Sequence, residues 1–183
     1  MRKFTSAILA GAFAAIATAA YAENPQVGGA AMFADKNIVE NAMNSKDHTT
    51  LVAAVKAAGL VETLQGPGPF TVFAPVNAAF EELPDGTVES LLKPENKDML
   101  TKVLTCHVVA VDAMSDAIGK MIKDDGGTHP VKTVGGCTLQ AKMDGDKITL
   151  TDETGGTATV TIADVRQSNG VIHVIDKVLL PKA

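Results

Sequence analysis

The stretch that decides the fold is F-T-V-F-A-P-V-N-A-A-F, residues 70–80. Its first five residues alternate and are rich in β-forming side chains, so they predict a strand ended by Pro75. Asn77 follows where its side chain can bond the free amides that open a short helix, predicted over residues 78–83. The stretch thus predicts a strand that leads directly into a helix.

A second decisive stretch, S-N-G-V-I-H-V-I-D-K-V-L-L-P, occupies residues 168–181. Asn169 and Gly170 predict a tight turn, because both residue types tolerate the backbone conformations that turns require. Residues 171–180 are apolar on both faces of a predicted strand, which is typical of the centre of a sheet. Both stretches therefore have a structural interpretation, in which they fix a sheet against helices.

The hydrophobic pattern divides the chain into a helical first half and a strand-rich second half. Apolar residues at helical spacing predict helices over residues 37–44, 51–58, 87–92 and 94–107, and another after Asp112. Alternating polarity later in the chain predicts strands over residues 137–143, 147–151 and 157–165. The pattern indicates an α+β fold in which a β-meander packs against helices.

The sequence also predicts where two helices begin and which face of a third is buried. Asp47 and Asp112 are expected to cap the helices that follow them, because their carboxylates can accept the first free amides. In the helix over residues 94–107, Met99 and Leu100 are expected to lie on the inner face, together with Val103 and Leu104.

The N-terminus has the pattern of an export signal. A positively charged start precedes an uncharged run over residues 4–20, and Ala20-Tyr21-Ala22 gives the small-x-small pattern of a cleavage site. A membrane anchor is the alternative, but the run is rich in Ala and Gly and no stop-transfer charges flank it. We therefore expect a cleaved signal peptide at 1–22, a short linker at 23–35 that is mobile, and a single domain at 36–183.

The charge of the predicted mature chain excludes some classes of partner. The 16 basic residues include Arg2 and Lys3, so the mature chain carries 14 against 21 acidic residues, a formal charge of −7. This charge, with no Trp and with the one Tyr removed by cleavage, argues against nucleic acid and anionic membranes as partners. No second apolar stretch is long enough for membrane insertion of the mature chain.

The two cysteines, Cys106 and Cys137, favour structural use. In an oxidising compartment they invite a disulfide, which would stabilise the fold by roughly 3–4 kcal/mol in the chain-entropy model. Two buried free thiols are the alternative. A redox centre would usually show C-x-x-C spacing, whereas these residues lie far apart in the sequence.

The two decisive stretches resemble the two signature blocks of the fasciclin-like domain family. Residues 104–109, L-T-C-H-V-V, resemble the Tyr-His block that lies between them, and the similarity runs from about Asn37 to Pro181. The resemblance implies a β-meander or β-sandwich wedge from the C-terminal half, packed against several helices from the N-terminal half. The block residues are Thr71, Phe73, Pro75, Asn77, Phe80, His107, Asn169, Gly170, His173 and Asp176.

The resemblance implies a non-enzymatic module for cell adhesion or protein interaction, with no shared reaction and no cofactor. Its partner would be a protein or a surface or matrix component, met in a bacterial periplasm, at the cell surface or after secretion. The family usually has tyrosine where this chain has Cys106, so a tyrosine-dependent adhesion role does not transfer directly.

One short segment resembles an adhesion motif. Asn96-Lys97-Asp98-Met99-Leu100 is similar to the Asn-Lys-Asp-Ile-Leu stretch through which some animal fasciclin-like domains engage integrins. Packing of Met99 and Leu100 on the inner helix face is the alternative.

The sequence contains none of the short-spaced histidine or cysteine motifs that are typical of metal sites. The four histidines, His48, His107, His129 and His173, form no short-spaced pair, and no H-E-x-x-H or C-x-x-C motif occurs. We therefore expect no metal, and we expect hydrogen-bonding roles for His107 and His173. Two other functions stay open: a periplasmic carrier of an apolar ligand such as a carotenoid or a lipid-like molecule, which the resemblance implies for some relatives, and an envelope redox protein that uses Cys106.

Overall fold

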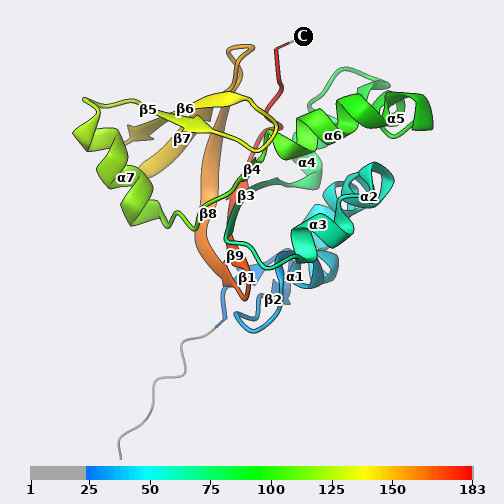
Figure 1. The fold of residues 1–183 in the computed structure, drawn as a ribbon, viewed down its shortest axis with the longest axis horizontal. Coiled ribbons are helices and arrows are strands. Elements are labelled where there is room, and N and C mark those ends of the chain that lie inside the picture. Colours follow the sequence, from blue (N-terminus) through cyan, green and yellow to red (C-terminus); the bar gives the residue numbers. More distant parts are fainter. Residues whose placement is uncertain (1–23, 183) are drawn as a thin grey trace, which may run out of the picture.

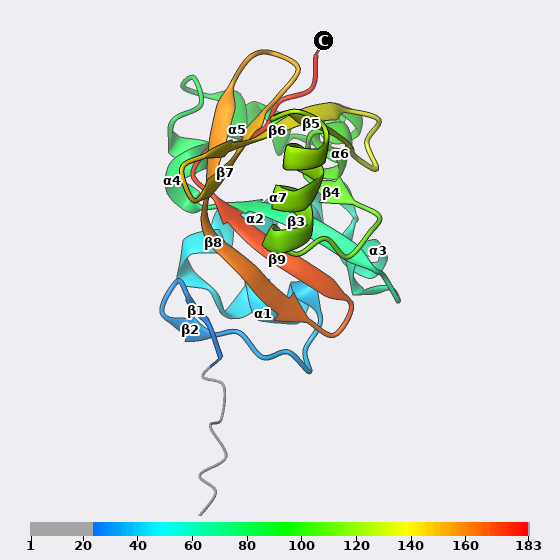
Figure 2. The ribbon, with the colours of Figure 1, turned by 90° about the vertical axis from the view of Figure 1, so that its left-hand side faces the viewer.

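The structure is a computed structural model that describes residues 24–182. The expected signal peptide, residues 1–22, lies outside this range. The described chain folds into helices that cover a mixed sheet, shown in Figures 1 and 2. The α+β class predicted from the sequence is confirmed.

The helices alternate with strands in the first half, and strands dominate the second half. The α-helices are α1 Ile38–Asn44, α2 Thr49–Ala58, α3 Val61–Gln65, α4 Asn77–Glu81, α5 Thr87–Leu91, α6 Lys97–Thr105 and α7 Ser115–Asp124. Two 3₁₀ turns, η1 Lys46–His48 and η2 Pro94–Asn96, precede α2 and α6. The strands are β1 Gln26–Val27, β2 Ala30–Ala31, β3 Phe70–Pro75, β4 Val108–Val109, β5 His129–Lys132, β6 Thr138–Asp144, β7 Lys147–Thr151, β8 Thr157–Gln167 and β9 Gly170–Ile175.

Within the described residues, seven strands form one sheet in the order β4-β3-β9-β8-β7-β6-β5. Strands β5 to β9 form the predicted antiparallel meander. Strand β3 runs parallel to β9, from Phe70 beside Gly170 to Pro75 beside Ile175. The two decisive stretches of the sequence are therefore direct neighbours in the interior of the sheet. The predicted central strand is confirmed, although it ends at Ile175 rather than near residue 180.

Strand β8 joins the two halves of the sheet. Its first residues pair with β7, and the rest of the strand pairs with β9 across two register shifts. Such shifts bend a strand. In Figure 1, helices α1 to α6 lie on one side of the β3–β9 pair, and α7 lies on the other, where it packs against β6.

Each side has its own hydrophobic core. One core contains side chains of α1, α2 and α6 packed on the sheet, including Leu51, Leu100 and Val174. The other lies between the bent halves of the sheet and α7, and includes Ile122 and Leu150. The predicted inner face of α6 is confirmed for Leu100, Val103 and Leu104, which are buried.

The expected caps were wrong, because neither aspartate is at an N-cap position: the N-caps of α2 and α7 are His48 and Met114. Asp47 is part of η1, so the first residue of α2 follows His48. Asp112 lies in the loop after β4, and the amide of Ser115 at the start of α7 donates to Asp164, 2.6 Å away. Side chains distant in the sequence thus replace the local caps.

Asn77 is also a cap, but of a different helix from the one expected. It is the first residue of α4, whose N-cap is Val76. Its Oδ1 accepts the amide of Thr50 at 3.0 Å, and its Nδ2 donates to the carbonyl of Lys46 at 2.9 Å. Asn77 therefore satisfies the N-terminus of α2 and ties α4 to it.

The expected mobile linker at 23–35 is ordered instead in its central part. Strands β1 and β2 pair as a hairpin there, and Val27 of β1 and Met32, which follows β2, are buried in the helical core. Gly28 has a positive φ of 59°, and a side chain at this position would collide with Ser45. The hairpin docks on the turn before α2 because glycine permits this close approach.

Candidate functional site

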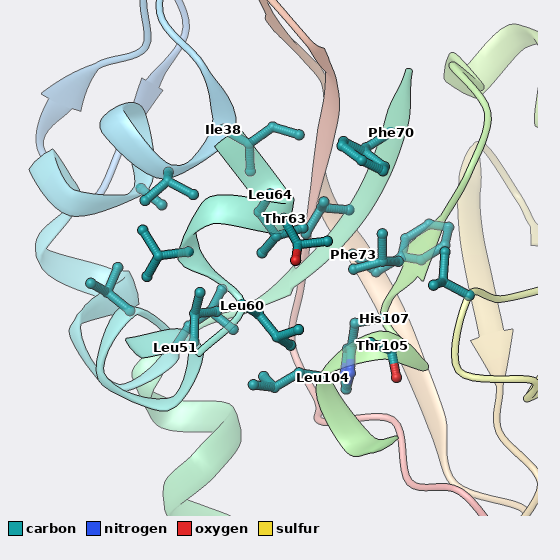
Figure 3. Close-up of a pocket in the computed structure, with 18 of the residues that line it drawn as sticks. Ile38, Leu51, Leu60, Thr63, Leu64, Phe70, Phe73, Leu104, Thr105 and His107 are labelled. Atoms are coloured by element: carbon teal, nitrogen blue, oxygen red, sulfur yellow. The ribbon is translucent and has the colours of Figure 1, made fainter. Parts of the chain in front are cut away.

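An apolar cavity of about 70 Å³ lies between the helices and the sheet. Figure 3 shows side chains converging on it from α1 and α2 on one side and from β3 and the end of α6 on the other. Its apolar lining consists of Ile38, Val39, Ala42, Leu51, Val52, Val55, Leu60, Val61, Leu64, Phe70, Val72, Phe73, Leu104, Val108 and Val134. The space exceeds the roughly 10–15 Å³ that a single water needs, but it offers water few hydrogen-bond partners.

Four polar residues complete the lining: Lys56, Thr63, Thr105 and His107. Among the described residues that line the cavity, Lys56 is the one that carries a full charge, and its side chain is exposed. The Thr105 hydroxyl donates to the carbonyl of Thr101 at 2.7 Å, so it is already engaged in α6. The cavity can therefore hold an apolar group and offers one cation at its rim.

His107 is a neutral member of the cavity wall. Its Nδ1–H donates to the carbonyl of Val103 at 2.8 Å, and its Nε2 accepts the amide of Leu179 at 2.9 Å. Burial lowers the pKa of His107 to about 4, because a charged ring would lose its hydration and would face an amide donor. His107 joins α6 to the segment after β9.

His173 connects the central strand to the loop before α7. Its Nε2–H donates to the carbonyl of Ala113 at 2.8 Å, and its Nδ1 accepts the amide of Asp164 at 3.2 Å. Burial lowers its pKa, so it too is neutral near pH 7. Its ring stacks on Phe73 of β3.

His48 repeats this arrangement at the start of α2. Its Nδ1 accepts the Ser45 hydroxyl at 2.8 Å, and its Nε2 faces the carbonyl of Ala74 at 3.4 Å. Burial again lowers its pKa. Three histidines in the described chain are therefore neutral hydrogen-bonding bridges, each with both ring nitrogens in use.

Asn169, one of the block residues, has three side-chain hydrogen bonds. Its Oδ1 accepts the amide of Ile38 at the start of α1, and its Nδ2 donates to the carbonyls of Leu64 at 2.7 Å and Gly66 at 2.9 Å. Gly170 follows with a φ of 155°, and a side chain there would collide with the backbone of Phe70. The turn between β8 and β9 therefore holds α1 and α3 against the sheet.

The remaining block residues also serve the scaffold. Thr71 donates to the carbonyl of Val111 at 2.6 Å and accepts the amide of Ala113. Asp176 accepts the amide of Thr159 at 2.6 Å. Phe80 is buried in the helical core, and Pro75 ends β3. The blocks come together around the β3–β9 pair, and Phe73 and His107 also reach the cavity.

Cys106 and Cys137 form a disulfide with a Cα–Cα distance of 5.4 Å, and both residues are buried. The alternative of two free thiols is therefore excluded for this structure. The bridge holds the loop at residues 133–137 against the end of α6, and the amides of Val134 and Gly135 add bonds to the carbonyls of Val108 and Thr105. The loop brings Val134 to the cavity.

The adhesion-like segment Asn96–Leu100 divides between core and surface. Leu100 is buried, whereas Met99 is 58% exposed, so the expected packing of Met99 was wrong. Successive helical residues point about 100° apart, so Met99 misses the face that Leu100 shares with Val103. Asn96 donates to the carbonyl of Ser90 at 2.7 Å and anchors the start of α6.

Sequence patterns missed the cavity itself. Its walls come from segments between Ile38 and Val134, and each looks like an ordinary core-facing stretch. No signal in the sequence distinguishes these stretches, since Leu60, Val61 and Phe70, which are half-buried in the structure, follow the same apolar patterns as core residues. Within residues 24–182, no three His, Cys, Asp or Glu side chains lie where they could hold a metal ion, and no helix has the length and apolarity to cross a bilayer.

Comparison with known proteins gives a consistent result. A family model described as the fasciclin domain matches residues 46–181. Protein sll1483 from Synechocystis is 51% identical over 144 residues, which cover 79% of this chain and 73% of that protein. The transforming growth factor-beta-induced protein ig-h3 of Sus scrofa is 37% identical over 133 residues, 73% of this chain and 17% of that much longer protein.

The fold has a counterpart among solved structures. A FAS1 domain pair from the insect cell adhesion molecule Fasciclin I superposes with a TM-score of 0.71 at 16% identity. The match covers 79% of this chain and 51% of that chain, so this chain spans about half of the domain pair. The similarity at this level of identity is one of fold.

Proposed function

The chain belongs to the fasciclin domain family, and from this membership we propose that it is an exported, non-enzymatic interaction module of the adhesion type. Its partner is a protein or a surface or matrix component met in the periplasm, at the cell surface or after secretion. The name of the insect relative, a cell adhesion molecule, supports this class of function. The export step rests on the sequence of residues 1–22.

The exposed outer face of α6 carries the proposal. Lys97, Asp98 and Met99, here called the α6 patch, are three exposed residues at the start of α6: a cation, an anion and an apolar side chain that follow one another around the helix in steps of about 100°. The backbone beneath the patch is rigid, because Leu100 is buried in the core and Asn96 is bonded to Ser90. Methionine is enriched in the cores of protein interfaces and polar residues lie at their rims, so this arrangement is suited to contact with another protein.

The state of the reactive groups supports a non-enzymatic role. His48, His107 and His173 use both ring nitrogens inside the scaffold. In the described chain, neither cysteine is free, because Cys106 and Cys137 are bonded to each other. A general base or a nucleophile needs a free group that can reach a substrate, and these groups do not offer one. The buried disulfide likewise gives the redox hypothesis no support.

A capture experiment tests the interaction role. Crosslinking in intact cells compares the native protein with a Lys97→Glu, Met99→Ser double variant and with Met43→Ser. Met43 is a suitable control, because it is an exposed methionine (48%) on α1, away from the α6 patch. We expect partners that are retained by Met43→Ser and lost by the double variant. Equal capture by both would contradict a role for the patch, and no capture above background would contradict the interaction function.

A second candidate function, transport or storage of an apolar ligand, is favoured by the cavity alone. Its volume of about 70 Å³ is smaller than the roughly 150 Å³ of an engineered cavity in another protein that takes benzene. A carotenoid ring, or a chain of more than a few carbons, would therefore need the walls to move. Solvent extraction of protein purified from its native source, followed by absorption and mass spectra, tests this function. An extract with no stoichiometric apolar compound would contradict it.

A further inference from the structure

We propose that the cavity takes the hydrocarbon chain of an anionic single-chain amphiphile, such as a fatty acid, and that Lys56 pairs with its head group. This inference rests on the second candidate function, apolar-ligand binding, and names the chemical class of the ligand. Three observations carry it: the composition of the walls, the neutrality of His107, and the position of Lys56.

The walls suit a flexible chain. Ile38, Leu51 and Leu64 face Phe70 and Phe73 across the cavity, as Figure 3 shows, and none of these side chains offers a hydrogen bond. A hydrocarbon chain that enters leaves water and gains dispersion contacts with both sides. The cavity of about 70 Å³ has room for a few carbons, so a longer chain also has to displace parts of the walls. A chain does this more readily than a fused or conjugated ring, because it can rotate about its bonds.

The positive charge at the rim is provided by Lys56 alone among the described lining residues. His107 contributes no charge near pH 7, since its ring is neutral and both nitrogens are bonded within the protein. Lys56 forms no ion pair with any residue between 24 and 182, so its ammonium group is available. Its methylene stem can lie along the apolar wall while the ammonium group stays in water.

Thr63 adds a hydrogen-bond donor to the same site. Thr63 is exposed, and Figure 3 shows its oxygen among the lining side chains. A carboxylate accepts such a bond readily, and a bond to a charged group is stronger than one between neutral groups. Lys56 and Thr63 therefore match an anionic oxygen head group rather than a cationic one.

The head-group preference is tested by calorimetry with two probes of equal chain length, dodecanoate and dodecyltrimethylammonium, both below the concentration at which micelles form. The native protein is expected to bind dodecanoate at one site, and more tightly than the cation. Lys56→Gln is expected to weaken dodecanoate binding about threefold to fivefold, as for an exposed ion pair, and to leave binding of the cation unchanged. Lys93→Gln removes an exposed lysine outside the cavity and should change neither affinity.

The location of the site is tested by filling the cavity from two different segments. Val52→Phe on α2 and Leu60→Trp before α3 each add bulk to the lining, and circular dichroism checks that each variant is folded. Both are expected to lose dodecanoate binding. Unchanged binding in a folded variant would overturn the proposed site.

The outcomes separate this inference from the function on which it rests. If both probes bind equally and Lys56→Gln changes neither, the anionic class is overturned while apolar-ligand binding stands. If neither probe binds, both are overturned. Neither result bears on the α6 patch, which lies outside the cavity lining.

Discussion

The ring of Phe73 stacks on the imidazole of His173, with centroids 5.8 Å apart and planes inclined by 26°. The two residues come from strands β3 and β9, which lie side by side although about a hundred residues separate them in the sequence. The amide of Phe73 also donates to the carbonyl of His107 at 2.9 Å. Residues from all three family blocks thus meet at one point, where they hold the fold together.

The neutral state of His107 predicts a loss of stability in acid. The pKa of this histidine is lowered by burial from 6.5 to about 4, so the unfolded chain takes up a proton at a higher pH than the folded protein does. Its contribution to the free energy of unfolding is fully present above pH 6.5 and is lost as the pH falls toward 4, by about 3 kcal/mol. Urea unfolding at a series of pH values measures this loss.

Variants at two histidines identify the source of the pH dependence. His107→Gln should flatten the curve between pH 6.5 and 4, although it is also expected to be less stable at pH 7 because the bonds to Val103 and Leu179 change. His129→Gln is the control variant, because it removes a histidine outside the core that contacts the carboxylate of Asp125. A His107→Gln curve as steep as the native one would show that other groups dominate.

Removal of the disulfide is expected to destabilise the protein substantially. Replacement of both Cys106 and Cys137 by Ala should lower the free energy of unfolding by about 2–4 kcal/mol, since the bridge closes a loop of 31 residues and both sulfurs are buried. Urea unfolding of the native protein with and without a reducing agent provides the control. The reductant should lower the stability of the native protein toward that of the double variant, and should leave the variant unchanged. A loss well under 1 kcal/mol would contradict the role of the bridge.

Asn169→Ala is expected to cost more than the loss of an ordinary asparagine. It removes one bond to Ile38 and two bonds to the carbonyls of Leu64 and Gly66, all in a half-buried setting. The expected loss is about 2–4 kcal/mol, at roughly 1 kcal/mol for each bond. Asn44→Ala is the matched control, because this exposed asparagine has a single bond, to the carbonyl of Glu40. Equal midpoints in thermal unfolding for the two variants would rule out the anchoring role of Asn169.

Asn77→Ala tests the cap that reaches α2 from a different helix. The substitution removes the acceptor for the amide of Thr50 and the donor to Lys46, with an expected loss of about 1–2 kcal/mol. Hydrogen exchange should accelerate most at the first amides of α2, and less within α4, where Asn77 itself lies. The opposite order would mean that Asn77 serves its own helix.

Local patterns predicted the individual strands well but not how they pair. The alternating residues of β3 and the apolar run of β9 were both evident, yet no local signal places Phe70 beside Gly170 in parallel. The same limit applies to Asn77, because its position before an apolar run suggested a local cap. Its real partners, Thr50 and Lys46, depend on how two helices pack.

For the candidate sites, too, some features could be predicted from the sequence and others depend on how the chain packs. The disulfide between Cys106 and Cys137 was expected from compartment and composition, and the structure confirms it. Met99 was misplaced because successive residues of a helix point about 100° apart, so an error of one residue in the position of the buried face moves a side chain off that face. The position of the buried face depends on where α6 starts, at Lys97. The cavity was invisible in the sequence, since its apolar walls have the composition of an ordinary core.

The interaction role is tested most directly by a photo-crosslinking amino acid placed at position 99, with position 43 as the control. Both sites are exposed methionines on helices, at 58% and 48%, so the two probes have similar access to solvent. Illumination of intact cells is expected to give a discrete higher-mass product from position 99 and none from position 43. The same products from both positions, or none from position 99, would contradict the proposal that this domain binds its partner through the outer face of α6.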